Sequence, residues 1–351
     1  MIGLLFLLVL ALSAESFHPV NNFGKNFRLG ALAPRRELFF EIIESGVLDR
    51  FPPGEDSPAT RINQFVRFAK FEEPLPIANR GAIAHDPCEE FVAGLTAKPW
   101  WDKADMDMST TKWIAELESQ SSIIAQELKD VLASEIQTRE RTFKGDSRYM
   151  QTMGSGWTAF RLQRLGIWNE ENVEKFPKTS TIIRELEIPL AVRGVMFAKQ
   201  APGSGVAPHS DGRNFILTAH LGLEGLVPPQ GCWIKVGIEE PRGWEEGKAL
   251  VFDTSFTHST GNESEEDRYV LIIDFWHPEL TAEERSLLEF IYDARNKFET
   301  GKAQEIDCSY VRSGQPVDEE EYTRSKTGAG KSIASAVSSF FNSGGLIKFN
   351  K

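Results

Sequence analysis

The sequence has few cysteines, fewer basic than acidic residues and no long apolar stretch after its start. Three cysteines among 351 residues do not make a disulfide framework, and their odd number leaves at least one thiol unpaired in a monomer. The chain carries 51 acidic against 39 basic residues, a formal net charge of −12. This balance argues against nucleic acid as a partner, because proteins that bind a phosphate backbone usually present a basic face.

Only the first fourteen residues form an almost wholly apolar run. The run is shorter than the roughly 20 residues that a membrane-spanning helix needs. It therefore predicts a secretory signal peptide, with a buried N-terminal helix as the alternative. No later stretch is apolar for long enough to cross a membrane, so we expect no transmembrane span in the mature chain.

Residues 17–36 contain four basic residues and no acidic one, a composition typical of transit peptides. Residues 1–36 are therefore interpreted as a signal peptide followed by a transit-like leader. Two destinations fit this leader: the endomembrane system or secretion, and alternatively a plastid reached through a bipartite leader. The acceptor sequence Asn262-Glu263-Ser264 is expected in a surface loop, where it could carry a glycan along the first route.

Three segments are expected to contain helices. Residues 109–142 place apolar side chains near the 3.6-residue period, which predicts one helix packed on the core. Thr179–Leu186 predicts a second helix, and a third should run from a cap at Thr281 to about Phe298. The aromatic spacing in Arg61–Phe71 fits a helix and an edge strand equally.

From Val192 onward the pattern changes to short strands separated by Gly, Pro and Asn turns. The expected strands are Val195–Lys199, Phe215–Leu223, Trp233–Ile238, Ala249–Asp253 and Tyr269–Trp276. Such spacing predicts a mainly β fold with flanking helices (α+β) and a double-stranded β-helix, or jelly-roll, core. Cys232 falls in this sheet region and is expected to be a buried thiol.

The length favours one large domain with extensions rather than two domains. After the leader, residues 37–94 are interpreted as a lead-in segment and residues 95–300 as the jelly-roll domain. Residues 301–351 are polar, acidic and then rich in small residues, which predicts a solvated C-terminal tail.

Three residues within the strand region suit a metal ion: His209, Asp211 and His258. In an extended strand, side chains two residues apart share a face, so His209 and Asp211 could reach one ion. Two imidazoles and a carboxylate form the facial site of non-haem Fe(II) oxygenases, although zinc in a hydrolase also fits. Without a metal, the first two would be a surface pair and His258 a core residue. Arg268 begins an apolar strand and could hold a carboxylate bidentately.

The region around these residues resembles the aspartyl/asparaginyl β-hydroxylase family of Fe(II)- and 2-oxoglutarate-dependent oxygenases. The matching residues are Pro208-His209, Asn214, His220-Leu221-Gly222-Leu223, Gly231-Cys232, Trp244-Glu245-Glu246-Gly247-Lys248, Phe252-Asp253, Ser255-Phe256, His258, Arg268 and Trp276-His277-Pro278-Glu279-Leu280. Upstream, Ala97-Lys98-Pro99-Trp100-Trp101, Gly156-Trp157 and Lys175-Phe176-Pro177 also look like this family. The likeness covers roughly residues 95–285.

The resemblance implies a role for each matching residue. His209 and His258 match the family's iron ligands, and Arg268 matches the arginine that holds the far carboxylate of 2-oxoglutarate. His220 matches the histidine that supports this cosubstrate, and Trp157 matches a tryptophan beside its pocket.

Three positions depart from the animal peptide hydroxylase. Asp211 stands where that enzyme has a glycine, so this chain looks closer to oxygenases with three protein ligands. Ala198 and Thr218 stand where it has a serine and an arginine that touch the cosubstrate. These two changes predict a different lining of the 2-oxoglutarate pocket.

The activity implied is hydroxylation of an unactivated carbon with Fe(II), 2-oxoglutarate and O2, with ascorbate as a reductant. The expected substrate is an aspartyl or asparaginyl residue in a peptide or protein. A lipid acyl chain or a small molecule is the alternative substrate. A non-catalytic metal-binding jelly roll is the alternative from another class.

Overall fold

The computed structural model describes residues 33–54, 57–74, 90–138, 141–143, 153–154, 156–318 and 321. The leader up to residue 32, Cys88 and the tail beyond residue 321 lie outside the described residues, and the predictions made for them stay predictions. The helices are α1 (Ala33–Arg50), α2 (Thr60–Lys70), η2 (Lys103–Asp105), α3 (Met108–Ser119), α4 (Ser121–Thr138), α6 (Glu170–Lys175), α7 (Pro177–Glu185), α8 (Ala282–Glu299), η3 (Ala303–Glu305) and α9 (Ser309–Arg312).

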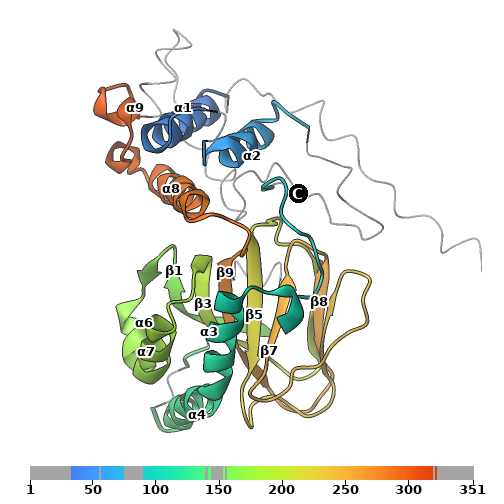
Figure 1. The fold of residues 1–351 in the computed structure, drawn as a ribbon. Coiled ribbons are helices and arrows are strands. Elements are labelled where there is room, and N and C mark those ends of the chain that lie inside the picture. The colour runs from blue at the N-terminus through green and yellow to red at the C-terminus, as the bar shows by residue number, and fades with distance from the viewer. Residues whose placement is uncertain are drawn as a thin grey trace, which may run out of the picture.

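The strands form two antiparallel sheets. They are β1 (Trp157–Arg164), β2 (Ile167–Trp168), β3 (Leu190–Gln200), β4 (Ser204–His209), β5 (Ile216–Gly222), β6 (Cys232–Val236), β7 (Ala249–Asp253), β8 (His258–Asn262) and β9 (Arg268–Trp276). The larger sheet has the order β2-β1-β3-β9-β5-β7, and the smaller has the order β4-β8-β6. The predicted jelly-roll core with flanking helices is confirmed by this arrangement (Figure 1).

The space between the sheets is filled by an apolar cluster that includes Trp100, Trp157, Trp244 and Phe252. Its members come from both sheets because side chains alternate along each strand and one face of each sheet points inward. In this interior, side chains of the two sheets face each other, and it positions the site described below.

The outer face of the larger sheet is covered by α3, α4 and α7 (Figure 1). The prediction of one helix over residues 109–142 was wrong, because α3 ends at Ser119 and α4 begins at Ser121. Gln120 lies between two serines, and serine favours helix ends because its hydroxyl competes for backbone hydrogen bonds. The apolar period survives the break because Leu117 and Ile124 pack in the same cluster.

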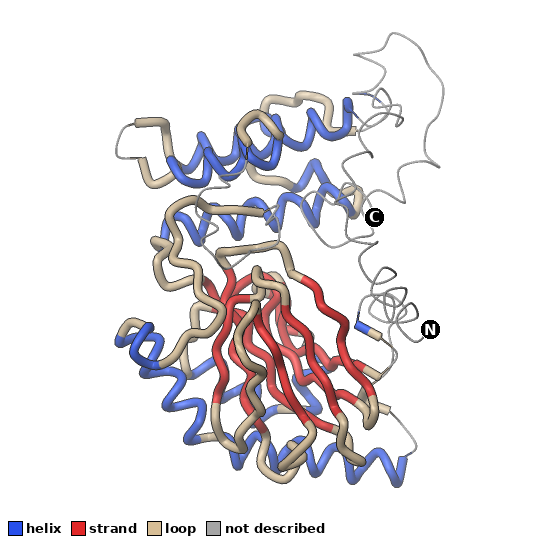
Figure 2. The backbone as a smooth tube through the Cα atoms, turned by 90° about the vertical axis from the view of Figure 1, so that its right-hand side faces the viewer, coloured by secondary structure: helices blue, strands red, loops and turns tan. Residues whose placement is uncertain are grey.

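A second helical group, formed by α1, α2, α8 and α9, packs beyond one end of the strands (Figure 2). The Arg61–Phe71 segment is therefore helical. Helix α8 begins with the predicted capping box, in which Thr281 accepts from the Glu284 backbone and Glu284 accepts from that of Thr281. We call α1, α2, α8 and α9 the helical cap.

The helical cap includes residues that were assigned to the leader and the tail. Helix α1 begins at Ala33, and η3 and α9 lie beyond residue 301. Ile306 and Cys308 are buried in the cap cluster, so packed structure extends to Arg312. Within the described ranges, no helix combines the length and apolar composition that a membrane crossing requires.

The predicted surface position of the glycosylation sequence was wrong. Asn262 ends β8, is fully buried, and donates through Nδ2 to the carbonyl oxygens of Gln200 (3.0 Å) and Glu266 (2.8 Å). A glycan on that nitrogen would replace one of its two hydrogens, so one of these hydrogen bonds would be lost in a fully buried position. Cys232 is a buried free thiol on β6, as expected.

Candidate metal centre and carboxylate pocket

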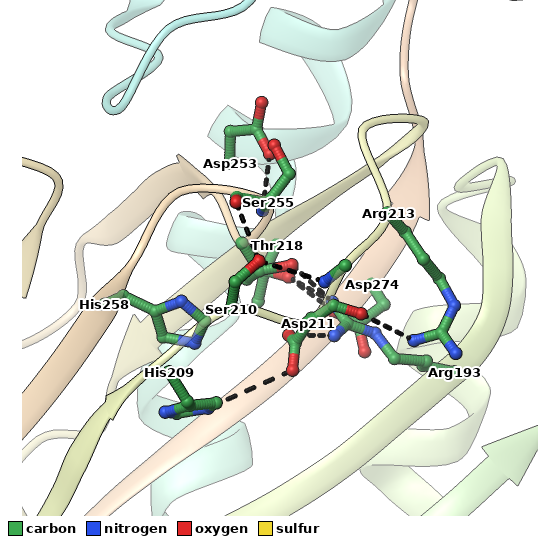
Figure 3. A network of polar contacts seen from close by, with 12 residues as sticks. Arg193, His209, Ser210, Asp211, Arg213, Thr218, Asp253, Ser255, His258 and Asp274 are labelled. Carbon is green, nitrogen blue, oxygen red and sulfur yellow. Dashed lines mark hydrogen bonds and ion pairs between the residues drawn. The ribbon is translucent and has the colours of Figure 1, made fainter. Parts of the chain in front are cut away.

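The two histidines predicted to bind a metal face each other across a strand pair. His209 ends β4, His258 begins β8, and the two are paired residues in the register of these strands. A register shift between Val206 and His209 brings them opposite. Their ring centroids lie 4.2 Å apart (Figure 3). The smaller sheet therefore supplies both imidazoles from one end of two neighbouring strands.

Asp211 joins the histidines from the loop that follows β4. The expectation that it shares an extended strand with His209 was wrong, because the strand ends at His209. The loop instead turns at Gly212, whose φ is +71°, and the backbone N–H of Asp211 donates to the Thr254 carbonyl (2.9 Å). One ligand atom from each of His209, Asp211 and His258 lies within 4.8 Å of the others.

Each histidine is oriented by a backbone carbonyl two residues before it. Nδ1 of His209 lies 2.9 Å from the Ala207 oxygen, and Nδ1 of His258 lies 2.9 Å from the Phe256 oxygen. A carbonyl only accepts, so Nδ1 of each neutral ring carries the proton and Nε2 is left as the ligand atom. Burial lowers the pKa of His258 to about 4, against the opposing charge of Asp211, so this ring is neutral at physiological pH.

A residue that sequence reasoning missed, Arg193, holds the metal-site carboxylate. Its Nη1 donates to Oδ2 of Asp211, and the pair forms a close ion pair (Figure 3). Burial alone would raise the pKa of Asp211, but Arg193, His258 and His209 outweigh burial and hold it well below its usual range. Asp211 is therefore an anion and a competent ligand. The sequence signal for Arg193 was a lone charge within the apolar run from Ala191 to Ala198.

The donor set fits a divalent transition metal. Two neutral imidazole nitrogens and one carboxylate oxygen suit Fe(II), and they leave part of the coordination sphere for small ligands. His209 and Asp211 keep about a fifth of their side chains exposed, 24% and 20%, so the site can be reached from solvent.

A second group of residues, which includes the predicted Trp157 and Arg268, lines the same interior beside the metal centre. Trp157, Gln200 and Arg268 are neighbours in register across β1, β3 and β9, so their side chains lie on one face of the larger sheet. Arg268 is 1% exposed, donates through Nη2 to Oε1 of Gln200, and lies over the Trp244 ring at 4.3 Å.

The guanidinium of Arg268 is buried without an acidic partner among the residues that the structure describes. The only hydrogen-bond partner found there is Gln200, and Nε has none. Burial lowers the pKa of Arg268 to about 10. A buried cation of this kind needs an anion to offset its desolvation, so the pocket suits the carboxylate of a small ligand.

His220 connects this pocket with the metal centre. Its ring stacks with that of Trp244 (6.1 Å, 14°) and meets the edge of Phe252 (4.8 Å), whose ring lies 6.2 Å from that of His258. Burial, followed by the charges of Arg268 and His258, places the pKa of His220 well below 6.5. Its Nδ1 has no hydrogen-bond partner within the described part of the chain, which leaves a polar atom for a ligand.

The two positions expected to change the pocket lining differ in their environment. Ala198 is fully buried in the interior cluster. Thr218 donates to Oδ1 of Asp274 (2.5 Å) and accepts from Nη2 of Arg193 (2.9 Å). The side chain at position 218 therefore supports a guanidinium that comes from the neighbouring part of the sheet.

Residues 118–278 match the sequence model of the family described as "Aspartyl/Asparaginyl beta-hydroxylase". The human "Aspartyl/asparaginyl beta-hydroxylase" is 33% identical over 57% of this chain and 25% of its own length. The "Ornithine lipid ester-linked acyl 2-hydroxylase" of Rhizobium tropici is 30% identical over 49% of this chain and 60% of its own length. A prolyl hydroxylase from Trichoplax adhaerens superposes with a TM-score of 0.34 and 14% identity, covering 53% of this chain and 99% of that chain.

The chain thus spans about a quarter of the human relative and 60% of the bacterial one. The matched region contains both sheets of the jelly roll and the residues around the metal centre and the carboxylate pocket. Over residues 118–278 the chain is therefore similar to the aspartyl/asparaginyl β-hydroxylase family.

Proposed function

We propose that the protein is an Fe(II)- and 2-oxoglutarate-dependent dioxygenase that hydroxylates an unactivated carbon. The convergence of His209, Asp211 and His258 within 4.8 Å carries this proposal, because this ligand set is the one that such oxygenases use. The buried guanidinium of Arg268, which has no acidic partner among the described residues, supports the proposal because it suits a carboxylate of 2-oxoglutarate. Bound iron would couple the conversion of 2-oxoglutarate and O2 to succinate and CO2 with insertion of one oxygen atom into a C–H bond.

Each part of the interior has a separate task in this proposal. His209, Asp211 and His258 would hold the iron, and Arg268 would hold the far carboxylate of 2-oxoglutarate. The neutral His220 offers Nδ1 as a polar contact, and Trp157 and Trp244 exclude water from the buried side of the pocket. The partly exposed face of His209 and Asp211 is then the side from which the substrate would approach.

The activity is tested by incubating the purified protein with Fe(II), 2-oxoglutarate, O2 and ascorbate and measuring succinate. Asp211→Ala should reduce iron affinity and turnover by roughly a hundred-fold or more, since even groups behind the ligands cost 10- to 100-fold. Activity at the wild-type level in this variant would remove Asp211 from the metal site. A chain that binds metal but forms no succinate would instead be the non-catalytic binding module.

Arg268→Ala tests the carboxylate pocket. A charge-assisted hydrogen bond contributes about 1.5–3 kcal/mol, so the concentration of 2-oxoglutarate needed for half-maximal rate should rise roughly 10- to 100-fold. Arg242→Ala is the matched control, because Arg242 lies outside the interior and pairs with Asp102 (3.0 Å). An unchanged requirement for 2-oxoglutarate in Arg268→Ala would exclude this residue as the anchor.

For the substrate, we propose an aspartyl or asparaginyl residue of a peptide or protein, which the matching family's name supports. The bacterial relative, named for an acyl chain of a lipid, makes a lipid acyl group the second candidate. Mass spectrometry of extracts of the native organism, incubated with and without enzyme, separates the two. The proposal for peptides requires a gain of one oxygen atom on Asp or Asn, and the same gain on a lipid would replace it.

A further inference from the structure

An irregularity in β3 turns Arg193 toward the interior of the jelly roll. Between Leu190 and Val195 the register advances five residues on β3 against two on β9, with Gly194 at a φ of +73°. Beyond this bulge, Val195 and Phe197 point to the outer helix-covered face. Regular alternation would send Arg193 to that same face, so the bulge re-aims it.

Once inside, the guanidinium of Arg193 connects four separate elements. Besides Oδ2 of Asp211, it donates through Nη2 to Thr254 (3.0 Å), Thr218 (2.9 Å) and Oδ1 of Asp274 (2.8 Å). These acceptors lie in the loop after β4, in the turn after β7, on β5 and on β9. The ligand-bearing loop of the smaller sheet is thereby attached to the larger sheet (Figure 3).

The two oxygens of Asp211 face different partners. Oδ2 is bound by Arg193, and Oδ1 faces Nε2 of His209 at 4.0 Å. The loop itself is anchored by the Asp211 N–H on the Thr254 carbonyl and by Ser210 Oγ on the Ser255 carbonyl (2.8 Å). These two anchors place the loop, and among the described residues Arg193 is the hydrogen-bond donor that holds the carboxylate itself.

We propose that Arg193 is a positioning residue that holds the Asp211 carboxylate by Oδ2, so that Oδ1 is presented to the metal together with the two histidines. This inference rests on the proposed function, because it concerns the same metal centre. The residue that holds the Asp211 carboxylate thus lies on β3, outside the segment that carries His209 and Asp211.

The arginine fork is the feature that performs this task. A guanidinium is planar and presents its donors in fixed directions. It can therefore bind the carboxylates of Asp211 and Asp274 at once and hold both in a defined orientation. A lysine would keep the positive charge but supply a compact, freely rotating ammonium group. Charge alone is therefore separable from positioning by comparing Arg193→Lys with Arg193→Met.

The test is a calorimetric titration of the metal-free protein with Mn(II), which measures the dissociation constant. This measurement does not require enzymatic turnover. Arg193→Met should weaken Mn(II) binding roughly 10- to 100-fold, the usual effect of removing a partner behind a ligand. Arg193→Lys should weaken it less but measurably. Lys199→Met is the control, because it removes a cation from the same strand that pairs with Asp267 (2.6 Å) rather than with Asp211, and it should bind Mn(II) as the wild type does.

A second set of variants separates positioning from general damage. In an Asp211→Asn background, adding Arg193→Met should change Mn(II) affinity by no more than about two-fold, because the carboxylate that Arg193 positions is already absent. If Arg193→Met weakens Mn(II) binding in that background as much as in the wild type, Arg193 has a general structural role and the inference is overturned. If Arg193→Met does not fold, Arg193→Lys decides: unchanged affinity overturns the inference.

The outcomes also separate this inference from the proposed function. Wild-type protein that binds no Mn(II) would refute the metal centre and the role of Arg193 with it. Wild-type protein that binds Mn(II), with both Arg193 variants binding equally tightly, would refute the role of Arg193 and leave the metal centre standing.

Discussion

The buried carboxyl group of Asp253 gives the protein a pH dependence that comes from one residue. Asp253 ends β7, is 0% exposed, and receives a hydrogen bond from the Ser255 N–H (2.8 Å) on Oδ1, while Oδ2 has no partner among the described residues. Burial raises its pKa from 3.8 to about 7, against the hydrogen bonds from Ser255 and the charge of Arg193. The folded protein therefore keeps a proton that the unfolded chain releases.

The raised pKa predicts that Asp253 lowers stability as pH rises. Between about pH 4 and pH 7 the folded state binds the extra proton, so the free energy of unfolding falls as that proton is lost. Asp253→Asn keeps the acceptor oxygen and removes the titration. For the metal-free proteins, the free energy of unfolding of the variant minus that of wild type should be about 2–3 kcal/mol larger at pH 8 than at pH 5.

Urea unfolding of both metal-free proteins at the two pH values measures this difference. Asp130→Asn on α4 is the matched control, because its side chain is exposed, and it should leave the comparison between the two pH values unchanged. If the free energies of unfolding of wild type and Asp253→Asn differ by the same amount at pH 5 and at pH 8, the prediction is contradicted.

At the residue scale, spacing could point to the candidate metal ligands but not to the residue that contacts their carboxylate. His209, Asp211, His258 and Arg268 belong to a pattern of residue types at set distances, and such a pattern is visible in a sequence. Arg193 stands out in the sequence only as a lone charge in an apolar run, and strand alternation would place it with Val195 on the outer face. Its inward direction depends on a bulge, which is a property of how two strands pair.

At the scale of elements, a carboxylate from one helix caps another. Glu127 on α4 is 6% exposed and accepts from the N–H groups of Lys178 (2.8 Å) and Thr179 (2.8 Å) and from the Thr179 hydroxyl (2.7 Å). These groups lie in the first turn of α7, where backbone N–H groups have no partner within the helix and the dipole favours a negative charge. Glu127 thus fixes the angle between α4 and α7 over the sheet.

Glu127→Gln tests this helix contact. The amide keeps one acceptor oxygen but loses the charge and presents N–H groups to donors, so unfolding should become easier by about 1–3 kcal/mol. Glu116→Gln on α3 is the control, since Glu116 is exposed and lies 3.9 Å from Lys112, and it should stay within about 0.5 kcal/mol. Equal urea midpoints for the two variants would show that the capping of α7 by Glu127 contributes nothing to stability.

The elements differ in how well sequence could predict them. The β5 and β9 strands are buried along their whole length and mostly apolar, so their composition indicates strands. The β4 and β8 strands, Ser204–His209 and His258–Asn262, are rich in small and polar residues, and their bounds were not predicted, although an extended segment at His209 was expected. They are strands because they pair with each other and with β6, and such long-range pairing leaves little trace in a local pattern.

At the scale of the whole molecule, the helical cap is joined to the metal-site loop. Arg213, two residues beyond Asp211, donates to Oε2 of Glu90 (2.8 Å) and to the Tyr292 hydroxyl of α8 (2.7 Å). Its Nη1 also donates to the Asp211 carbonyl (3.2 Å). Burial would lower the pKa of Arg213, but Glu90, Tyr292 and Asp211 together outweigh burial and raise that pKa. The cap therefore restrains the same loop that carries a ligand.

The cap is also the part of the fold that sequence could least predict. Asp49 on α1 accepts from the Ser309 hydroxyl and pairs with Arg312 (3.0 Å). These residues are some 260 positions apart, and neither segment has a pattern that names the other as its partner. A jelly roll was predictable because its strands follow one another closely, whereas the cap joins the two ends of the described chain.

Because the ligands come from separate places in the chain, metal binding should stabilise the whole fold. His209 and His258 are adjacent only when β4 pairs with β8, so the unfolded chain lacks the site and metal binds the native state preferentially. Mn(II) at a hundred times its dissociation constant should then add about 2.7 kcal/mol to the free energy of unfolding. In a protein of this size the melting temperature should rise by several degrees, as differential scanning calorimetry with and without Mn(II) would record.

His258→Ala separates this linkage from unspecific metal effects. The variant loses one ligand, and its melting temperature should no longer respond to Mn(II) over the same concentration range. Lys199→Met, whose cation lies outside the metal centre, should respond as the wild type does. An equal rise in His258→Ala would place the stabilising metal elsewhere on the protein and break the link between the jelly-roll pairing and the metal centre.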